Sequence, residues 1–372
     1  MITTALLSLS LLLYTYAGYP ILVALLAAAF PRKPRSTPAY EPTVSACLSV
    51  FNAAAFLPAK LDSLLALDYP AEKLEVLVYD DGSTDESADI VRRYAARDPR
   101  VKLVRGQDRQ GKPTALNTLR ELAKGEVLLM NDARQPISPG SLRALVRMLA
   151  DPKVGCVSGD LILQGAAGAG AYWKYEKWIR RNEARFCSLT GVTGAIYVVR
   201  KDDLAELPRD TVCDDMWIPL RLRLSGREIL FCEDAQAFDE AFDDDRELGR
   251  KVRTLAGNFQ IFARMPNLLL PFVNPSWFEV VSHKVLRLAC PWALVALLVS
   301  SGWASVAPGA GSALLTTGMR ALVASQVLFY LLALVGARAG RLPGLCRTFV
   351  VLNAAALVAF WRHVRGAQRI SW

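Results

Sequence analysis

The sequence predicts an α/β domain with a mostly parallel sheet, placed between transmembrane helices at the two ends of the chain. Strand-like apolar runs alternate with helix-like segments over residues 43–264, which is typical of a parallel sheet covered by helices on both faces. Hydrophobic residues make up 52% of the 372 residues, and uncharged apolar runs long enough to cross a bilayer lie at both ends.

The first element is an apolar run from Ile2 to Phe30 that contains no charged residue. Basic residues follow this run at Arg32 and Lys33, whereas a cleavable signal peptide carries its positive charges before a shorter run. We therefore predict an uncleaved transmembrane anchor over residues 1–30, with its N-terminus outside. Residues 31–42 are rich in proline and polar side chains, which predicts a linker.

The α/β domain begins after this linker. We predict its first elements in chain order, as strands over 44–51, 74–79, 101–105 and 127–131, and helices over 54–67, 113–123 and 138–149. Ser83 and Glu86 have the spacing of a capping box for a further helix after the second strand.

The C-terminal region returns to the membrane. Residues 265–284 mix proline, tryptophan and phenylalanine with large aliphatic residues, which predicts an interfacial segment that seats the domain on the bilayer. Within residues 285–372, the runs 288–308 and 314–335 are long enough to span. The last apolar run, 348–361, is short, and we predict a membrane-associated helix that does not cross.

The net charge of +9 has its origin in this C-terminal region. No Asp or Glu follows Glu279, and the basic residues after it are Lys284, Arg287, Arg320, Arg338, Arg341, Arg347, Arg362, Arg365 and Arg369. These charges flank apolar runs, which indicates juxtamembrane positive charge and no nucleic-acid partner. They place the central domain and the basic tail on the cytoplasmic side of the membrane.

The cysteines and histidines exclude several site types. The seven cysteines form no CxxC pair and are scattered, which fits reduced thiols in a cytosolic domain. The two histidines leave little room for a histidine-based metal cage or catalytic triad. The first strand is followed by neither a GxGxxG loop nor a GxxxxGK[ST] loop, so dinucleotide-binding and P-loop sites lose support.

Polar side chains follow three of the predicted strands. Asn52 comes after the first strand, Asp80 and Asp81 end the second, and Asp132 follows the fourth. Because the carboxyl ends of parallel strands meet at one edge of a sheet, we expect these side chains to share a ligand site. Carboxylates there can accept hydrogen bonds from a nucleoside, or hold a hard divalent cation against a diphosphate.

Eight motifs occur in an order that matches one known family. They are YTYAGYP, VYDDGSTD, GKPTALN, NDAR, TGAIYVVR, CDDMWIPLRLRLSGRE, RKVRTLAGNFQ and SHKVLR. With them the chain resembles the inverting glycosyltransferases of family 2, which have the GT-A fold. It is most similar to the membrane-embedded branch that includes cellulose, chitin and hyaluronan synthases and bacterial exopolysaccharide glycosyltransferases. The resemblance covers nearly the whole chain.

The resemblance implies a donor site for a nucleotide sugar. Asp80 and Asp81 would hold the uracil and ribose of a UDP-sugar, with Asn52 at the same pocket. Lys112, in a Gly-Lys loop, would reach the nucleotide or the diphosphate. The family often has a glutamate after the asparagine, and this chain has Ala53 instead.

The metal motif of the family is incomplete in this chain. Asp132 occupies the first position of the Asp-x-Asp motif, but Arg134 replaces the second acid. Two interpretations remain open. Asp132 and the diphosphate would hold Mg²⁺ or Mn²⁺ with water in the remaining positions, or Arg134 would itself neutralise phosphate charge.

Catalysis requires a base that deprotonates the acceptor hydroxyl as it attacks the anomeric carbon. The family motif maps onto Cys213-Asp214-Asp215, so the resemblance implies that Asp215 is the base, with Asp214 beside it. Arg253 is retained from the Gln-x-x-Arg-Trp motif and would stabilise the departing diphosphate. Arg250 and Thr254 replace the glutamine and tryptophan of that motif, which argues against a processive polymer synthase.

The acceptor side is predicted from one loop and one helix. Gly191, Thr193 and Gly194 would let the backbone approach a sugar closely. Trp178, in an aromatic stretch upstream, would stack on a sugar ring or pack in the interior.

The function predicted from these residues is transfer of a sugar from a UDP-sugar to a growing polysaccharide or lipid-linked oligosaccharide at a bacterial inner membrane. Two alternatives remain. One is a polyprenyl-phosphate glycosyltransferase, whose acceptor is the lipid phosphate. The other is a degenerate, nucleotide-binding membrane scaffold of a polysaccharide-export complex. We expect a lipid bilayer as partner, and either a homo-oligomer or export proteins beside it.

Overall fold

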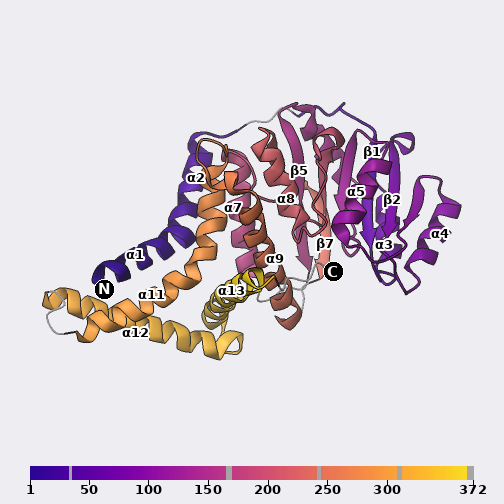
Figure 1. Cartoon of the computed structure of the whole chain (residues 1–372). Helices are drawn as coiled ribbons and strands as arrows, with labels where there is room; N and C mark the ends of the chain where they lie inside the picture. Colours follow the sequence, from indigo (N-terminus) through magenta and orange to yellow (C-terminus); the bar gives the residue numbers. More distant parts are fainter. Residues whose placement is uncertain (33–35, 165–169, 241–243, 308–311, 367–372) are drawn as a thin grey trace.

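The computed structural model of the chain describes residues 1–32, 36–164, 170–240, 244–307 and 312–366. It has an α/β domain on one side and a set of long apolar helices on the other (Figure 1). The membrane-type helices α1, α11 and α12 lie together at the lower left of this view, away from the sheet.

The α/β domain contains one mixed sheet in the order β3-β2-β1-β4-β6-β5-β7. Among the described strands β6 is the only antiparallel one, and it lies between β4 and β5. The bounds of the strands are β1 Val44–Val50, β2 Leu74–Asp80, β3 Val101–Arg105, β4 Val127–Asn131, β5 Val154–Gln164, β6 Tyr197–Arg200 and β7 Glu228–Glu240. The four strands predicted from the sequence are confirmed, and the mostly parallel sheet with them.

Helices cover both faces of the sheet, which explains why every residue of β1 is buried. One core layer joins the sheet to α3, α4 and α6, through residues such as Leu57 and Leu142. The second layer joins it to α5 and α8, through residues such as Leu119 and Ile218. The helices of the domain are α3 Leu57–Leu65, α4 Ser87–Arg97, α5 Lys112–Leu122, α6 Ser141–Val146, α7 Gly170–Phe186, α8 Asp214–Leu224 and α9 Asp244–Arg264.

The predicted capping box before α4 is wrong. The helix begins at Ser87, and its N-cap residue Glu86 makes no side-chain capping hydrogen bond. The Ser83 hydroxyl instead accepts a hydrogen bond from the backbone amide of Asn52, 2.9 Å away. The Ser83 amide donates to Oδ1 of Asp80. This serine therefore closes the turn after β2, because a turn beginning at Gly82 (φ +77°) offers it nearer partners than the helix does.

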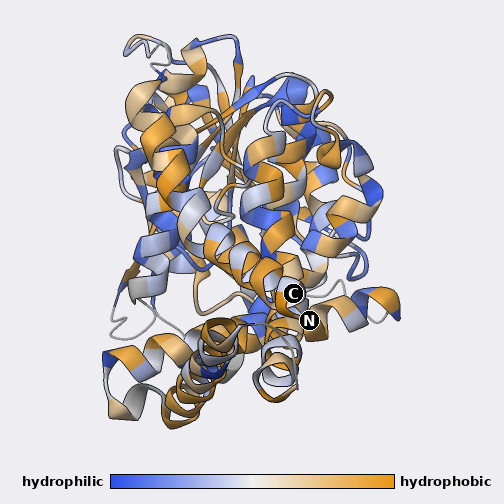
Figure 2. Cartoon of the chain, turned by 90° about the vertical axis from the view of Figure 1, so that its left-hand side faces the viewer, coloured by the Kyte–Doolittle hydropathy of each residue, from blue (hydrophilic) through white to orange (hydrophobic). Residues whose placement is uncertain are grey.

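Four helices are long and apolar enough to cross a membrane by length and composition. Figure 2 shows these helices mostly in the hydrophobic colour, whereas the helices of the α/β domain mix both colours. The first comprises α1 Ile2–Leu13, a π-helical segment Tyr14–Gly18 and α2 Tyr19–Ala29. The second comprises α10 Trp277–Glu279, a π-helical segment Val280–Val285 and α11 Leu286–Val306. The third is α12 Ala313–Val335 and the fourth is α13 Arg341–Val364.

The last helix is longer than the sequence analysis predicted. Instead of a short run over 348–361, α13 has 24 residues and is a candidate span. Its C-terminal half packs on α9 of the α/β domain, with Ala355 and Ala359 against Val252 and Ala256. This contact with the α/β domain is compatible with a helix that lies along the membrane, and its course relative to the bilayer stays a prediction.

The seven cysteines are free, and all but Cys187 are buried. None is placed to form a disulfide, which agrees with the reduced thiols expected from their scattered spacing. They contribute to the core as small apolar side chains, for example Cys47 on β1 and Cys156 on β5.

Candidate active site

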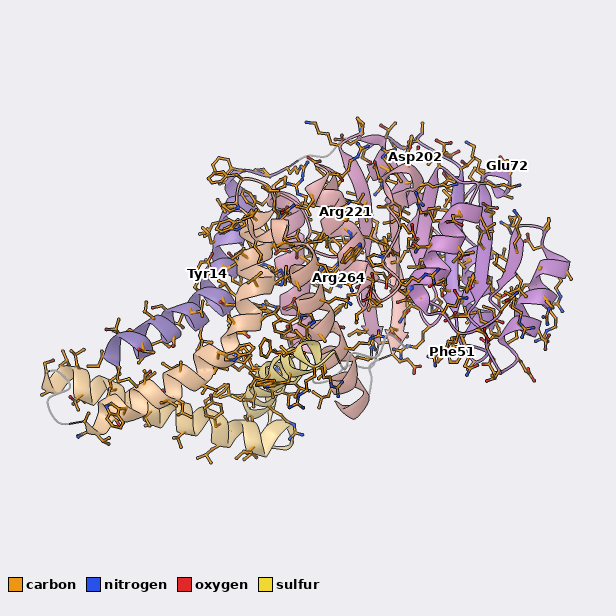
Figure 3. All side chains as sticks on the ribbon, viewed as in Figure 1. Tyr14, Phe51, Glu72, Asp202, Arg221 and Arg264 are labelled. Carbon is orange, nitrogen blue, oxygen red and sulfur yellow. The ribbon has the colours of Figure 1, made fainter. Side chains whose placement is uncertain are left out.

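The polar residues predicted to share a site lie at one edge of the sheet. Figure 3 labels Phe51, which follows β1, at the lower edge of the sheet. Glu72, just before β2, and Asp202, just after the antiparallel β6, lie at the opposite edge. The carboxyl ends of β1, β2 and β4 therefore meet at the lower edge, as the parallel pairing requires.

Asp80 and Asp81 are fully buried and hold two loops. Asp81 accepts hydrogen bonds from the backbone amides of Gln110 and Gly111, both at 2.8 Å. Oδ1 of Asp80 accepts from the Ser83 amide at 2.9 Å. Oδ2 of Asp80 is buried and has no hydrogen-bond partner within the described part of the chain, while Nε of Arg105 lies 3.6 Å from it in an ion pair. A buried acceptor of this kind loses free energy until a donor reaches it, so it is suited to a ligand hydroxyl or amide.

Asn52 shapes the same corner. Its φ is +49°, a left-handed conformation that asparagine tolerates better than most residues. Its side-chain oxygen accepts a hydrogen bond from the Thr84 amide at 2.9 Å. Next to it, the Arg109 guanidinium lies 3.8 Å from the centre of the Phe51 ring. Asn52 therefore fixes the loop after β2, which borders the edge where Asp80 and Asp81 lie.

Lys112 joins three elements of the site. It is the first residue of α5, and its Nζ lies 2.8 Å from Oδ1 of Asp132 and 3.0 Å from Oδ2 of Asp214. Burial by itself would lower the pKa of Lys112, but Asp132 and Asp214 outweigh this effect and raise it. The ammonium group is therefore charged at every physiological pH.

Asp215 lies in the first turn of α8, directly after Asp214. Burial, followed by the charge of Asp214, raises the pKa of Asp215 to about 6, while Lys112 opposes the shift. A carboxylate with this pKa is ionised near neutral pH and is a stronger base than an ordinary aspartate. Its backbone carbonyl accepts a hydrogen bond from the Val192 amide at 2.9 Å, which ties it to the predicted acceptor loop.

The predicted acceptor loop, residues 191–194, touches the other carboxylates of the site as well. A Cβ added at Gly194 would lie 2.9 Å from Oδ2 of Asp132, so only glycine allows this close approach. Thr193 is buried, and its amide donates to the Ser158 hydroxyl on β5 at 3.1 Å. Gly191 approaches the backbone carbonyl of Asp215. The loop therefore lies between Asp132 and Asp215.

Trp178 lies on α7 and is 38% exposed. The side chains of α7 that reach β5 beside the acceptor loop are Lys177, 2.5 Å from Asp160, and Arg180, 3.1 Å from the Ser158 hydroxyl. The structure therefore brings Arg180 to the floor of the loop, a contact that the sequence analysis missed. Whether Trp178 stacks on a sugar stays a prediction.

Arg134 is held by a carboxylate that the sequence analysis also missed. Its Nη2 lies 2.6 Å from both oxygens of Asp239 on β7, and Gln135 donates to the same carboxylate at 2.8 Å. Asp239 thus balances the charge of Arg134. Arg253 on α9 lies close enough to Asp215 to lower its pKa, which places a second guanidinium at this site.

The geometry agrees with what comparison with known proteins shows. The model of glycosyl transferase family 2 matches residues 45–207, a range that includes Asp80, Asp81, Lys112 and Asp132. The chain contains a family 2 glycosyltransferase domain. This glycosyltransferase domain has the GT-A fold, because a mannosyltransferase from Pyrobaculum calidifontis, solved in complex with GDP-Man and Mn²⁺, superimposes with a TM-score of 0.77. The two chains are 25% identical, and the match covers 97% of this chain and 99% of that one.

Two curated relatives match part of this chain over part of their own length. A beta-monoglucosyldiacylglycerol synthase from Nostoc sp. is 26% identical over 199 residues, or 50% of this chain and 42% of the relative. An N-acetylglucosaminyltransferase from Rhizobium meliloti is 31% identical over 178 residues, or 45% of this chain and 41% of the relative. The chain thus spans less than half the length of these relatives.

A divalent cation fits the glycosyltransferase domain only with help from the donor. The side chain of Asp132 is 35% exposed, and Lys112 contacts one of its oxygens. No group of three or more Asp, Glu, His or Cys side chains able to hold a metal occurs among the described residues. Mg²⁺ often binds through one carboxylate, substrate phosphates and water, so Asp132 can hold such an ion together with a diphosphate.

A buried lysine lies behind Asp132 and was not predicted. Lys60 on α3 has no exposed surface, and its Nζ donates to the carbonyl of Gln135 at 2.7 Å. Burial lowers the pKa of Lys60 to about 7, against the opposing effect of Asp132. The charged form is thus disfavoured in the folded glycosyltransferase domain.

We expect this lysine to make stability rise with pH. The unfolded chain keeps Lys60 protonated up to about pH 10, whereas the folded domain releases that proton near pH 7. Between these values the unfolded state binds more protons, so the stability of wild type increases by up to about 1.4 kcal/mol per pH unit. In Lys60→Met this contribution is absent. Melting temperatures of both proteins in detergent, from pH 7 to 9.5, check the prediction, and parallel curves would contradict it.

Proposed function

We propose that the protein is an inverting glycosyltransferase that transfers a sugar from a UDP-sugar to a growing polysaccharide or lipid-linked oligosaccharide at the cytoplasmic face of a bacterial inner membrane. The observation that carries the proposal is the position of Asp215. It is a carboxylate of raised pKa beside the Lys112–Asp132–Asp214 ion pairs, and its backbone is tied to the loop 191–194.

The donor would lie along the carboxyl edge of the sheet. Its nucleoside would meet Asp80, whose Oδ2 has no hydrogen-bond partner within the described part of the chain. Its diphosphate would lie near Lys112, whose ammonium group offers a fixed positive charge. Asp132 would hold Mg²⁺ or Mn²⁺, which supplies positive charge to the departing diphosphate.

The acceptor would approach from the side of loop 191–194. Asp215 removes the proton of the acceptor hydroxyl while that oxygen attacks the anomeric carbon of the donor. The bond between the anomeric carbon and the diphosphate breaks in the same displacement, and its electrons leave with the nucleoside diphosphate. Arg253 would stabilise the charge of that leaving group. A single displacement inverts the configuration and forms no covalent sugar–enzyme intermediate.

The membrane would supply the acceptor. The turn between α9 and α10 exposes large apolar side chains, with Phe272 fully exposed and Leu270 and Val273 about half exposed. This turn is suited to dip into the interfacial region of a bilayer. A carrier lipid that holds a sugar would then lie close to the glycosyltransferase domain. The basic residues that flank the C-terminal helices support a cytoplasmic position for the domain.

The pH dependence of transfer tests the role of Asp215. Only the ionised carboxylate accepts a proton, so we expect the transfer rate to fall as the pH drops through about 6, the pKa of Asp215. The rate should be nearly constant between pH 7 and 8. Initial rates at saturating donor, from pH 4.5 to 8, provide the measurement. A rate that stays constant down to pH 5 would show that another group is the base.

The identity of the reaction is tested by nucleotide release. Purified protein in nanodiscs is offered UDP-glucose, UDP-N-acetylglucosamine and GDP-mannose, each with Mn²⁺, with Mg²⁺ or with EDTA, and with bacterial lipid extract as acceptor source. We expect metal-dependent release of UDP that increases with the extract. Release of GDP alone would replace the UDP assignment. Metal-independent release would move charge stabilisation to Lys112, Arg134 and Arg253.

Polyprenyl phosphate separates the proposed acceptor from the lipid-phosphate alternative. We expect little transfer to polyprenyl phosphate itself, because the loop 191–194 offers backbone close to the base and is suited to a sugar rather than to a phosphate. Efficient formation of a polyprenyl-phosphate sugar would assign that alternative. Binding of nucleotide with no release from any donor would favour the scaffold.

A further inference from the structure

A buried group of charged and polar side chains, called the membrane junction below, joins the glycosyltransferase domain to two membrane-type helices. It contains Glu176 and Glu183 of α7, Tyr19 of α2, and His283 and Arg287 at the start of the α10–α11 helix. Oε1 of Glu183 accepts a hydrogen bond from the Tyr19 hydroxyl at 2.5 Å and lies 2.6 Å from Nδ1 of His283. On the other side of the imidazole, Nε2 lies 3.3 Å from Glu176, which also pairs with Arg287.

The burial of this group is nearly complete. Glu183, His283 and Tyr19 have no exposed surface. Apolar packing already joins the same helices, because Tyr19 and Val23 of α2 contact Ile179 of α7, and the Tyr19 ring meets Phe278 at 5.4 Å. The hydrogen bonds and ion pairs of the junction therefore add directional contacts to helices that apolar side chains already hold together. Such contacts fix the rotation and register of a helix rather than its mere attachment.

Both membrane-type helices change from α-helical to π-helical geometry at the membrane junction. The π-helical segments Tyr14–Gly18 and Val280–Val285 meet there, and the Tyr14 hydroxyl lies 2.9 Å from the Ser282 hydroxyl. A π-helical turn changes which side chains face a neighbouring helix, and such turns are common at functional sites. Figure 3 labels Tyr14 at the bend between α1 and α2.

The same face of α7 reaches the acceptor loop. Arg180 lies one helical turn from both Glu176 and Glu183, so the three side chains share one side of α7. Arg180 donates to the Ser158 hydroxyl at 3.1 Å. The same hydroxyl accepts the amide of Thr193 at 3.1 Å. The amide of Val192, the residue before Thr193, donates to the backbone carbonyl of Asp215. Continuous contacts thus run from the membrane junction through α7 to the backbone of Asp215.

We propose that His283 is a positioning residue for the acceptor side of the transfer reaction. By holding Glu183 and Glu176 it fixes the orientation of α7, and Arg180 of α7 then fixes the loop 191–194 against Asp215. The inference rests on the proposed function for its consequence in turnover. Its structural part, the dependence of the loop on the junction, stands on the contacts alone.

Two substitutions of His283 test its contact with Glu183 and its contact with Glu176 separately. The amide nitrogen of asparagine can occupy the place of Nδ1 and keep the contact with Glu183, whereas that of glutamine can occupy the place of Nε2 and keep the contact with Glu176. Leucine keeps neither. We expect His283→Leu to lower kcat for transfer at least 10-fold with the donor KM within twofold of wild type. His283→Asn should recover most of this loss, and His283→Gln should recover less.

Tyr14→Phe is the matched control. It removes a hydrogen bond at the same junction, but one that does not lead to α7. We expect its kcat to stay within twofold of wild type. A loss of kcat in Tyr14→Phe as large as that in His283→Leu would overturn the proposal, because any disturbance of the junction would then suffice. Equal losses of donor affinity and kcat in His283→Leu would overturn it as well.

A readout that needs no turnover keeps the inference separate from the proposed function. Hydrogen–deuterium exchange of the full chain in nanodiscs reports the Thr193 and Val192 amides. We expect faster exchange in 190–194 in His283→Leu and in Ser158→Ala, with no change at Gln110 and Gly111, whose amides donate to Asp81. Unchanged exchange in 190–194 would refute the inference even if transfer is confirmed. If the exchange changes as expected but no donor is turned over, the proposed function fails and the coupling stands.

Discussion

Asp215→Asn is expected to lower the transfer rate at least 1,000-fold while the affinity for the nucleotide donor stays within about threefold of wild type. Asparagine has nearly the same shape as aspartate but cannot accept the proton of the acceptor hydroxyl. General-base catalysis contributes roughly 100- to 10,000-fold to enzymatic rates. The loss should therefore fall on kcat, because the residues proposed to contact the nucleoside and the diphosphate lie on β2 and α5 rather than on α8.

The measurement is nucleotide release under single-turnover conditions, together with donor binding by calorimetry. Asp202→Asn is the matched control, because Asp202 is an exposed aspartate at the opposite edge of the sheet (Figure 3). We expect it to behave as wild type. A variant Asp215→Asn that keeps more than a tenth of the wild-type rate would remove Asp215 as the base, and Asp214 would then be the next residue to replace.

Lys112→Met is expected to have the second-largest effect, a loss of at least 100-fold in kcat/KM for the donor. The ammonium group of Lys112 lies within 3.0 Å of both Asp132 and Asp214. Without it, the carboxylates at the site repel one another and the incoming diphosphate loses a fixed positive charge. The same change should move the acid limb of the pH–rate profile above pH 6. The reason is that Lys112 lowers the pKa of Asp215 in wild type, and this effect is lost in the variant.

A control variant and a rescue variant make the prediction for Lys112 specific. Lys102→Met serves as control, since Lys102 pairs with Glu75 on the neighbouring strand and lies outside the site. Lys112→Arg should restore part of kcat/KM, because it keeps the charge in a different geometry. An unchanged pH profile in Lys112→Met would mean that the lysine acts on the donor alone. An unchanged donor KM would mean that it acts only on the carboxylates.

The edge of the sheet could be predicted because the ends of its strands are marked locally in the sequence, by polar residues that directly follow apolar runs. Asp80, Asp81 and Asp132 each directly end or follow an apolar run, and parallel pairing then brings them together. Asp215 and Lys112 were placed by family motifs, and their proximity to Asp132 and Asp214 in the structure is compatible with those roles.

Other residues could not be predicted because their partners are distant in sequence. Asp239 meets Arg134 across 105 positions, and no local pattern marks either residue as half of a pair. Lys60 resembles an exposed helix lysine in the sequence, yet it is fully buried below the turn after β4. The Ser83 capping box failed for a related reason, since Asn52 and Asp80 compete for the same serine. In each case a tertiary contact outweighed a local preference.

The reversed direction of β6 has a consequence for how new specificities arise. Residues that would hold the nucleotide precede residue 135 in the chain, whereas the loop that enters β6 and the proposed base on α8 come after residue 187. The two halves of the reaction are therefore encoded in consecutive blocks, whose strands pair in the sheet at β4 and β6. Recombination between related genes at that boundary could exchange the acceptor while leaving the activated sugar unchanged. A laboratory chimaera joined between β4 and β5 would exploit the same division.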